Sequence, residues 1–370
     1  MKEAFQKGVT EGRDGKGIIY VFAAGNERQL ENINAHIFEK TRYTITVGAV
    51  SKKLYGWTED YSTSGTAVFV SAPAGNREDS INLLAIGGHG TCINSGSGTS
   101  FAAPIVTGVI ALMLEARPDL TWRDVQGILA VTSEKIHDPD DSSAHKNSAG
   151  FWHSHWYGFG IIDAKKAVDT AITWELWPPE QQVVGESARE NQPFPDISET
   201  EYVSELTINH KYKTGFISES VVVSLNLKHY NHGRLKLTLV SPSGTESILN
   251  DGNSSEHGIL GGSEKLELMT LRSWGEDPTG VWQLKVRDFS SKGVILSNEN
   301  VFLDWVLVVY GRVRRPKVSC WQVPSYAKRY SPDCGGASWD ELVKTCQEAD
   351  VCDCIPSEYK QFNPDCYNKP

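Results

Sequence analysis

Gly98-Thr-Ser-Phe-Ala-Ala-Pro104 is the stretch that decides how this 370-residue chain is interpreted. Residues 101–117 are small and apolar on every side, which predicts a long helix buried at the centre of a fold. Pro104 falls in the first turn, where it is tolerated, and Pro118 ends the helix. Ser100 then stands where helix N–H groups and the positive end of the helix dipole can stabilise a developing oxyanion. Taken alone, Ser100 is equally well explained as an N-cap.

Three short apolar runs accompany this helix. They are Gly17-Ile-Ile-Tyr-Val-Phe-Ala-Ala24, Tyr43-Thr-Ile-Thr-Val-Gly-Ala-Val50 and Thr66-Ala-Val-Phe-Val-Ser71. Such runs are typical of strands that are buried on both faces of a parallel sheet. The first is followed by Asn26, at the carboxyl end of its strand, where α/β sheets place their ligand sites. The amide of Asn26 can supply an oxyanion donor there, although Gly-Asn is also common turn chemistry.

Two more helices are expected in the same part of the chain. Residues 2–15 have the amphipathic pattern of a helix. Another helix begins after Thr121, whose side chain can form a capping box with Asp124, and runs to about Ser133. Helices that alternate with buried strands predict an α/β fold with a mostly parallel sheet.

Composition divides the chain into four regions. The α/β pattern covers residues 1–172, and residues 173–200 are rich in Trp, Pro and polar side chains, which is typical of an extended linker. In residues 201–313 short strands follow one another without helices and predict an antiparallel sandwich or barrel. Residues 314–370 form a separate cysteine-rich tail.

The tail contains six of the seven cysteines. They are Cys320, Cys334, Cys346, Cys352, Cys354 and Cys366. A dense, even set indicates a disulfide-stapled module made in an oxidising compartment. A zinc cluster is the alternative, but the spacing is not that of paired Cys-x-x-Cys motifs. The segment from Met1 to Gly8 has no apolar stretch of a secretory signal, so we expect the true amino terminus to lie upstream of Met1. The glycosylation sequon at Asn253 agrees with export.

Charge and hydropathy exclude some functions. With 36 Lys and Arg against 46 Asp and Glu, the formal net charge is −10, which argues against a general nucleic-acid binder. No window approaches 18 consecutive apolar residues, so we expect no transmembrane segment.

Several motifs, in this order, resemble known families. The chain resembles the carboxyl half of a subtilisin-like serine protease in three segments: Ala23-Ala-Gly-Asn26, Tyr43-Thr-Ile-Thr-Val-Gly-Ala49 and Gly98-Thr-Ser-Phe-Ala-Ala-Pro104. Within that group it resembles the kexin and furin branch, the proprotein convertases, in four segments: Tyr61-Ser62, Val68-Phe-Val-Ser-Ala-Pro-Ala-Gly75, Leu120-Thr-Trp-Arg-Asp-Val-Gln126 and Tyr157-Gly-Phe-Gly-Ile-Ile-Asp-Ala164. The P domain of that branch, a jelly roll, is resembled by Ser241-Pro-Ser-Gly-Thr245, Trp274-Gly-Glu276 and Gly280-Val-Trp-Gln-Leu-Lys-Val-Arg-Asp288. The resemblance covers residues 1–312 and leaves the tail outside.

The resemblance implies a serine endopeptidase with Ser100 as nucleophile and Asn26 as oxyanion donor. Its substrates would be polypeptides, cleaved after basic residues, in the Golgi lumen or outside the cell. It also implies calcium, for which no ligands can be identified in the sequence. The family's catalytic aspartate and histidine precede the oxyanion asparagine, and neither has a matching position in the 25 residues before Asn26. A serine without a base is a poor nucleophile, so residues 1–370 alone are expected to be inactive.

Other reactive side chains have simpler explanations. His89 lies in a His-Gly-Thr sequence like that around the family's catalytic histidine, but only eleven residues before Ser100, so we expect a solvated loop. His153 and His155 could bind a metal, although packing in a loop between aromatic residues is favoured. The family pairs the cysteine at the position of Cys92 with one further upstream; the alternative is a free buried thiol.

The specificity pocket departs from the family. Residues 27–37 lack the Cys and Asp pattern that the resemblance implies, and Thr63 stands where it implies a glutamate. Glu31 could add negative charge, but a solvated loop glutamate is favoured. Residues 312–315, rich in arginine and followed by Pro316, are interpreted as a basic strand end.

Three hypotheses remain open. The chain is the carboxyl portion of a kexin-like endopeptidase, or a non-catalytic binding scaffold, or one half of a domain that a separate chain completes. A parallel sheet that lacks its first strands exposes apolar edges, which favours the first hypothesis over a stable half-domain.

Overall fold

The computed structural model describes residues 2–53, 56–58, 61–75, 83–193, 201–212, 215–229, 231–252, 265–289 and 300–314. Residues 1–314 form one compact unit, and residues 315–370 are divided from it. The six tail cysteines and the sequon at Asn253 therefore lie outside the described residues.

Three strands of the first sheet are parallel, as the sequence predicts. β1 (Tyr20–Ala23) pairs with β2 (Thr44–Lys53), and β2 pairs with β4 (Val70–Pro73), both in parallel. β3 (Gly56–Thr58) adds an antiparallel partner at the end of β2. Among the described strands β1 pairs with β2 alone, so one edge of β1 has no strand beside it.

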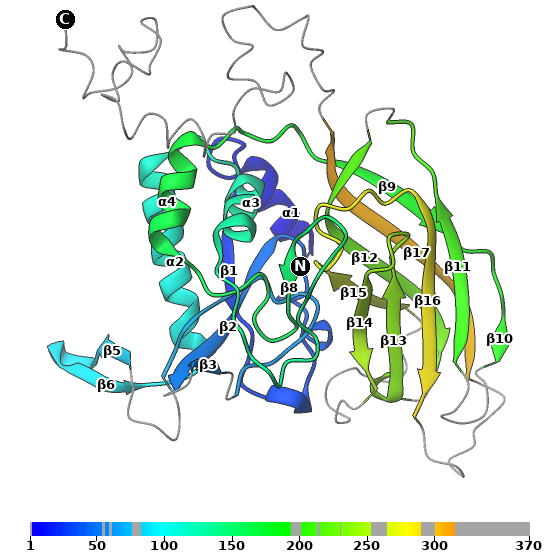
Figure 1. Cartoon of the computed structure of the whole chain (residues 1–370), viewed down its shortest axis with the longest axis horizontal. Coiled ribbons are helices and arrows are strands. Elements are labelled where there is room, and N and C mark those ends of the chain that lie inside the picture. Colours follow the sequence, from blue (N-terminus) through cyan, green and yellow to red (C-terminus); the bar gives the residue numbers. More distant parts are fainter. Residues whose placement is uncertain are drawn as a thin grey trace, which may run out of the picture. The chain divides into compact units, whose positions relative to one another are not determined.

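Four helices accompany this sheet (Figure 1). They are α1 (Lys2–Glu11), α2 (Thr99–Ala116), α3 (Trp122–Thr132) and α4 (Ala164–Thr173). α2 packs against β1, β2 and β4, and α4 packs against both α2 and α3. The capping box predicted at Thr121 is present and starts α3. α1 ends four residues earlier than expected, in a turn where Gly12 and Gly15 accept and donate backbone hydrogen bonds.

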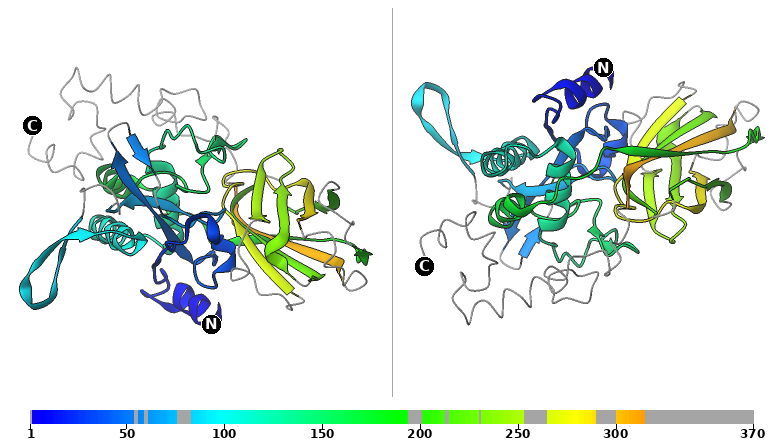
Figure 2. Two further views of the ribbon diagram at one scale, coloured as in Figure 1. Left: turned by 90° about the horizontal axis from the view of Figure 1, so that it is seen from below. Right: turned by 90° about the horizontal axis from the view of Figure 1, so that it is seen from above.

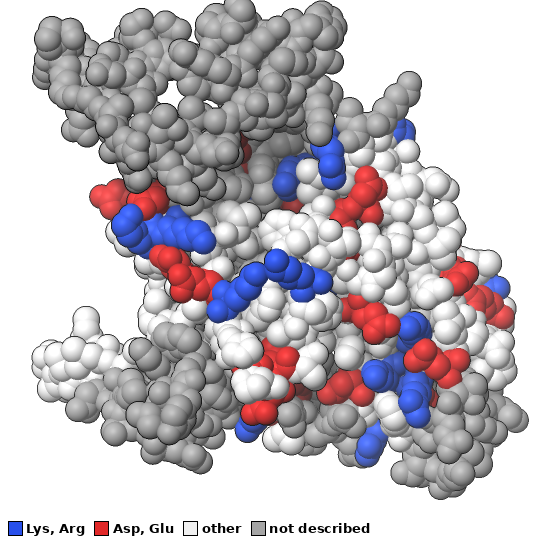
Figure 3. Space-filling view, viewed as in Figure 1, with Lys and Arg blue, Asp and Glu red and all other residues white. Residues whose placement is uncertain are grey.

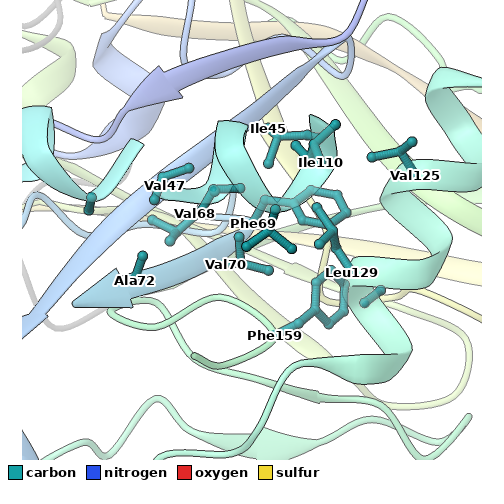
Figure 4. Packing of buried hydrophobic residues seen from close by; sticks show 14 of the residues in the cluster. Ile45, Val47, Val68, Phe69, Val70, Ala72, Ile110, Val125, Leu129 and Phe159 are labelled. Atoms are coloured by element: carbon teal, nitrogen blue, oxygen red, sulfur yellow. The ribbon is translucent and has the colours of Figure 1, made fainter. Parts of the chain in front are cut away.

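The core of this region lies between the sheet and the helices. Figure 4 shows Val47 and Val70 of the sheet beneath Ile110 of α2, with Leu129 of α3 and Phe159 closing one side. All five side chains are at most 4% exposed. The short apolar runs of the sequence therefore supply the buried layer of this region.

One expectation about α2 is wrong. Its apolar composition predicts burial on every side, but one face is exposed, with Thr107, Gly108, Ala111 and Leu112 in solvent and Leu112 51% accessible. α2 is also long and apolar enough to cross a bilayer, but one such helix is weak evidence that the chain spans a membrane. An apolar helix face is expected to pack against a partner, and the described residues cover only part of the surface of α2.

A hairpin of β5 (Leu83–Ile86) and β6 (Cys92–Gly96) extends away from the helices (Figure 2). His89 lies exposed at its tip, as the sequence predicts for a solvated loop. Cys92 is free and exposed, so the alternative of a buried thiol is wrong. A second small hairpin joins β7 (His145–Lys146) to β8 (Trp152–His153).

The remaining strands form two antiparallel sheets. One has the order β10–β17–β12–β15 with β9 also on β17, and the other has the order β11–β16–β13–β14. The strands are β9 (Gln181–Glu186), β10 (Gln192–Pro193), β11 (Tyr202–Ile208), β12 (Phe216–Lys228), β13 (Leu235–Val240), β14 (Glu246–Asp251), β15 (Lys265–Thr270), β16 (Gly280–Asp288) and β17 (Val301–Val313). Both sheets contribute to one core around Trp282 and Trp305, as expected of a sandwich. The jelly-roll connectivity stays a prediction.

One segment differs in detail from the sequence interpretation, and another agrees with it. Residues 173–200, interpreted as a linker, contain β9 and β10, which pair with β17. The arginine-rich end of β17 is a strand end, as expected, and Arg312 donates to Glu219 at 2.8 Å. β9 is six residues long and largely polar, so the pattern of its side chains gives little sign of sheet pairing.

Polar and apolar contacts join the α/β region to the strands of the sandwich. Asn34, fully buried, donates to the carbonyls of Leu249 and Met269 at 3.0 and 3.2 Å and accepts from Met269 N at 2.8 Å. Arg123 of α3 makes two hydrogen bonds to Glu219 of β12, at 2.8 and 2.6 Å, and both residues are buried. These contacts lie within the same compact unit.

Candidate active site

The turn after β1 places Asn26 beside the start of α2. Gly25 has φ +101°, and a Cβ there would lie 2.6 Å from Glu27 Oε2 and 2.8 Å from Thr63 Oγ1. Only glycine suits both the conformation and the space. Gly25 N also donates to Thr99 Oγ1 at 3.2 Å, so the turn is tied to the helix.

A second glycine shapes the start of α2. Gly98 has φ +118°, and its buried N–H donates to the phenol oxygen of Tyr61 at 2.6 Å. The same phenol donates to the carbonyl of Gly75 at 2.7 Å. Tyr61 is 5% exposed, so its hydroxyl fixes the turn from the interior, while Ser100 is exposed on the outside.

Asn26 lies beside Thr99, the residue that precedes Ser100. Asn26 Oδ1 accepts from Thr99 N at 2.9 Å and from Thr99 Oγ1 at 3.1 Å. The carboxamide is therefore anchored by its oxygen one residue before Ser100, and Nδ2 is the group that remains to donate. The N-terminal end of α2 adds a positive electrostatic field at the same place. This geometry suits a group that carries developing negative charge.

Sequence reasoning missed Glu27. Its Oε2 accepts from Asn26 N at 2.7 Å and from Thr63 Oγ1 at 3.0 Å, and Glu27 N donates back to Thr63 Oγ1 at 3.1 Å. The family resemblance implies a glutamate at position 63. This chain has Thr63 there instead, and the Glu27 carboxylate lies beside it. No short-range pattern announces this, because the two residues are 36 positions apart.

Glu31 does not behave as a solvated loop residue. Its Oε2 lies 2.9 Å from His36 Nε2, and both side chains are largely buried. Glu39 Oε1 lies 3.6 Å from the other ring nitrogen of His36. Glu39, and then Glu31, raise the pKa of His36, although burial opposes the shift. His36 therefore bridges two carboxylates.

The calcium that the resemblance implies does not fit this cluster. Among the described residues, one group of three His, Cys, Asp or Glu side chains brings its ligand atoms within 4.8 Å of one another, and it consists of Glu27, Glu31 and His36. Calcium takes six to eight oxygen ligands, whereas a histidine nitrogen suits transition metals. We therefore route no chemical step through calcium.

The other histidines pack as the sequence predicts. His153 Nε2 lies 3.0 Å from the carbonyl oxygen of Val68, and its ring meets Phe159 edge-on at 5.1 Å between centroids. Burial, followed by the charge of Arg272, lowers the pKa of His155 to about 3. Neither histidine belongs to a group of metal-ligating side chains in the described part of the chain.

Comparisons with known proteins agree with this architecture. Residues 1–160 match the Subtilase family, and residues 218–307 match the proprotein convertase P-domain. A dibasic-processing endoprotease of Schizosaccharomyces pombe is 33% identical over 323 residues, which cover 85% of this chain and 44% of that protein. This chain belongs to the kexin-type proprotein convertase family. Protease KEX1 of Kluyveromyces lactis is also 33% identical, over 84% of this chain and 40% of its own length.

Two further comparisons mark the extent of the likeness. Human proprotein convertase subtilisin/kexin type 6 is 32% identical over 85% of this chain and 32% of its own length. The chain thus spans less than half of these curated convertases. A serine protease of Aeromonas sobria superposes with a TM-score of 0.72, at 22% identity, over 84% of this chain and 67% of that one. At this identity the superposition shows a shared fold.

Proposed function

We propose that this convertase hydrolyses peptide bonds as a serine endopeptidase, with Ser100 as nucleophile and Asn26 as oxyanion donor. The observation that carries the proposal is the anchoring of Asn26 Oδ1 on Thr99 N at 2.9 Å. It holds the carboxamide at the start of α2, beside the residue that precedes the exposed Ser100, which supports the assignment.

The chemistry follows from these groups. Ser100 Oγ forms a bond to the scissile carbonyl carbon, and the carbonyl electron pair moves onto oxygen. Asn26 Nδ2 and the N–H groups at the start of α2 donate to that oxyanion. The serine proton passes to a histidine and from there to the leaving amine, which departs as the carbonyl re-forms. Water then hydrolyses the acyl-serine ester, releases the carboxyl product and restores the Ser100 hydroxyl. The histidine and its aspartate are supplied by polypeptide outside residues 1–370, so these residues alone are inactive.

The incomplete surfaces of the α/β region support a missing partner segment. Among the described strands none pairs with the second edge of β1, and the exposed face of α2 presents Ala111 and Leu112. A strand beside β1 and a helix or strand over α2 would satisfy both. We propose that the segment with the aspartate and histidine covers these surfaces, either on the same polypeptide or on a separate chain.

Cleavage after basic residues is the finer part of the proposal. A relative named a dibasic-processing endoprotease supports it, as do the carboxylates of Glu27 and Glu31 in the loop that follows Asn26. Opposite charge favours a lysine or arginine side chain in that place. The secretory pathway, in the Golgi lumen or outside the cell, is proposed on the cysteine-rich tail and on the kinship with the convertases.

The test reconstitutes the enzyme. The transcript upstream of Met1 is read for an in-frame aspartate and histidine, and residues 1–370 are expressed alone and together with that segment. We expect a fluorophosphonate probe to label Ser100 only in the combined protein, and S100A to abolish both labelling and cleavage of a fluorogenic peptide with paired basic residues. N26A should keep labelling detectable but lower kcat by about 10²–10³, the loss measured for the corresponding amide of a subtilisin.

Several results would contradict the proposal. Cleavage that survives S100A would remove the nucleophile assignment. Equal rates of cleavage of a peptide with basic residues and of one with alanines in their place would contradict only the proposed specificity for basic residues. A stop codon directly upstream, no labelling and cooperative unfolding of residues 1–370 would together favour the binding scaffold.

A further inference from the structure

A cavity lies between α1, the residues just before β2, the first turn of α3 and the segment that precedes β9. Its volume is about 520 Å³, within the range of about 300–1,000 Å³ that is typical of small-molecule sites. The lining residues that carry the argument are Lys16, Arg42, Tyr43, Trp122, Trp177 and Glu180. Aromatic walls with a few convergent charged groups are the usual make-up of a ligand site.

Aromatic rings form part of the wall. Tyr43 and Trp122 meet edge-on, with 5.8 Å between their centroids, and Trp177 lines the cavity from the segment before β9, together with two prolines. The guanidinium carbon of Arg42 lies 4.3 Å from the centroid of Tyr43 and 3.9 Å from that of Tyr310. The Arg42 side chain is therefore held among rings and is 12% exposed. Such a wall favours a flat aromatic ligand, because aromatic rings pack well against one another in offset or edge-on geometry.

Positive charge exceeds negative charge in this wall. The cationic lining residues are Lys16, Arg42 and Arg123, and the acidic one is Glu180. Arg123 is already paired with the buried Glu219, at 2.6 Å. The ammonium group of Lys16 makes one hydrogen bond within the described part of the chain, of 3.4 Å, to a backbone carbonyl. In a chain whose formal net charge is −10, this local surplus favours an anion.

Arg42 has hydrogen-bond donors to spare. Among the described residues it donates to Glu180 and, at 3.1 Å, to the hydroxyl oxygen of Tyr43. A guanidinium group carries more N–H groups than these two partners can use. Because arginine binds carboxylates through charge-assisted hydrogen bonds, the remaining N–H groups suit a carboxylate ligand.

We propose that this cavity binds a small aromatic carboxylate, whose ring lies against the aromatic side chains and whose carboxylate accepts from Arg42 and Lys16. The competing explanation is that Arg42 and Glu180 only fasten the segment before β9 to the start of β2. In that case the cavity has no preference between charged and uncharged rings. The proposal does not rest on peptide hydrolysis, because the described lining residues do not include Ser100 or Asn26.

The experiment titrates the whole chain with para-fluorophenylacetate at pH 7 and follows the fluorine NMR signal of this probe. Two molecules with the same ring are control ligands: para-fluorophenylacetamide, which is uncharged, and para-fluorobenzylamine, which is cationic. We expect one equivalent of the acid to bind at least about tenfold more tightly than either control, because hydrogen bonds to a charged group are the stronger ones.

Variants locate the site. R42Q should weaken binding of the acid by at least about tenfold, and K16Q by about three- to tenfold. E180Q removes a like charge and should tighten binding by about two- to fivefold. T10W fills the cavity from an exposed position of α1 without changing charge, and should abolish binding. The matched control is K7Q, which removes an exposed lysine of α1 outside the described lining and should leave the affinity unchanged.

Several outcomes would overturn the proposal. They are no binding of the acid to the wild-type chain at millimolar concentration, equal affinity for the acid and its amide, tighter binding of the amine, and unchanged affinity in T10W. Circular dichroism and thermal unfolding show which variants fold. If R42Q does not fold, T10W and E180Q decide the outcome, since one tests the place of binding and the other the sign of the ligand charge.

Discussion

The two layered regions of this chain differ in how completely they close. In the sandwich, both sheets bury one core, with Trp282 and Trp305 at most 1% exposed. In the α/β region, the edge of β1 lacks a strand among the described residues, and one face of α2 is exposed. The α/β region therefore depends on contacts outside its own sheet, and we expect the sandwich to be the more stable of the two regions.

Some of those contacts come from the sandwich. Trp274 packs edge-on against Phe69 at 5.7 Å and against Phe159 at 5.3 Å between centroids, so it belongs to the α/β core. Asn34 and Arg123 make the polar part of the junction. On the described part of the face shown in Figure 3, positive and negative side chains are scattered among uncharged ones, without a continuous basic patch.

Breaking the buried ion pair should have the largest effect. E219Q removes the buried charge that faces both Arg123 and Arg312, and leaves Glu180, 3.9 Å from Arg123 Nε, as the remaining carboxylate beside Arg123. We expect a loss of about 3–5 kcal/mol in the free energy of unfolding, measured by urea denaturation. E205Q, which changes an exposed glutamate, should stay within about 0.5 kcal/mol. Equal effects in the two variants would mean that the junction does not couple the regions.

Removing Asn34 should have the next largest effect. N34A leaves Met269 N and two carbonyls without their buried partner, at an expected cost of about 2–3 kcal/mol. Unfolding followed by tryptophan fluorescence measures it, with Q6A on the exposed face of α1 as the control. If N34A unfolds the α/β region while the sandwich signal persists, the sandwich is shown to stand alone.

For each buried histidine, acid should weaken the junction by a smaller amount. Burial, then Arg272, lowers the pKa of His153 far below 6.5 and that of His155 to about 3, so both are neutral in the folded chain. The unfolded chain binds more protons between pH 6.5 and 3, so stability falls as pH falls through this range. Each such histidine adds a slope of up to about 1.4 kcal/mol per pH unit.

Urea denaturation at pH 7 and pH 5 measures this slope. H155Q should reduce it, and H89Q, an exposed site, should leave it unchanged. A slope that is identical in all three proteins would show that His155 is already solvated and that the junction does not sense pH.

Local signals in the sequence predicted what depends on local physics. The apolar runs became β1, β2 and β4, and the capping box started α3. The contact of Asn26 with Thr99 joins residues 73 positions apart and is not a local effect. Glu27 and Tyr61 could not be found in this way, because each acts on residues 36 or 37 positions away. The exposure of α2 was also beyond the sequence, since an apolar face does not say whether its partner belongs to the same chain.

The projecting hairpin has a practical consequence for handling the purified protein. Ile86 is 90% exposed, and it pairs across the two strands with Cys92, whose thiol is free and exposed. When two molecules associate through these exposed apolar hairpins, their Cys92 thiols come close to each other, and air oxidation can then form an intermolecular disulfide. Gel filtration without reductant would report that adduct as a dimer, and a reducing agent would return it to single molecules.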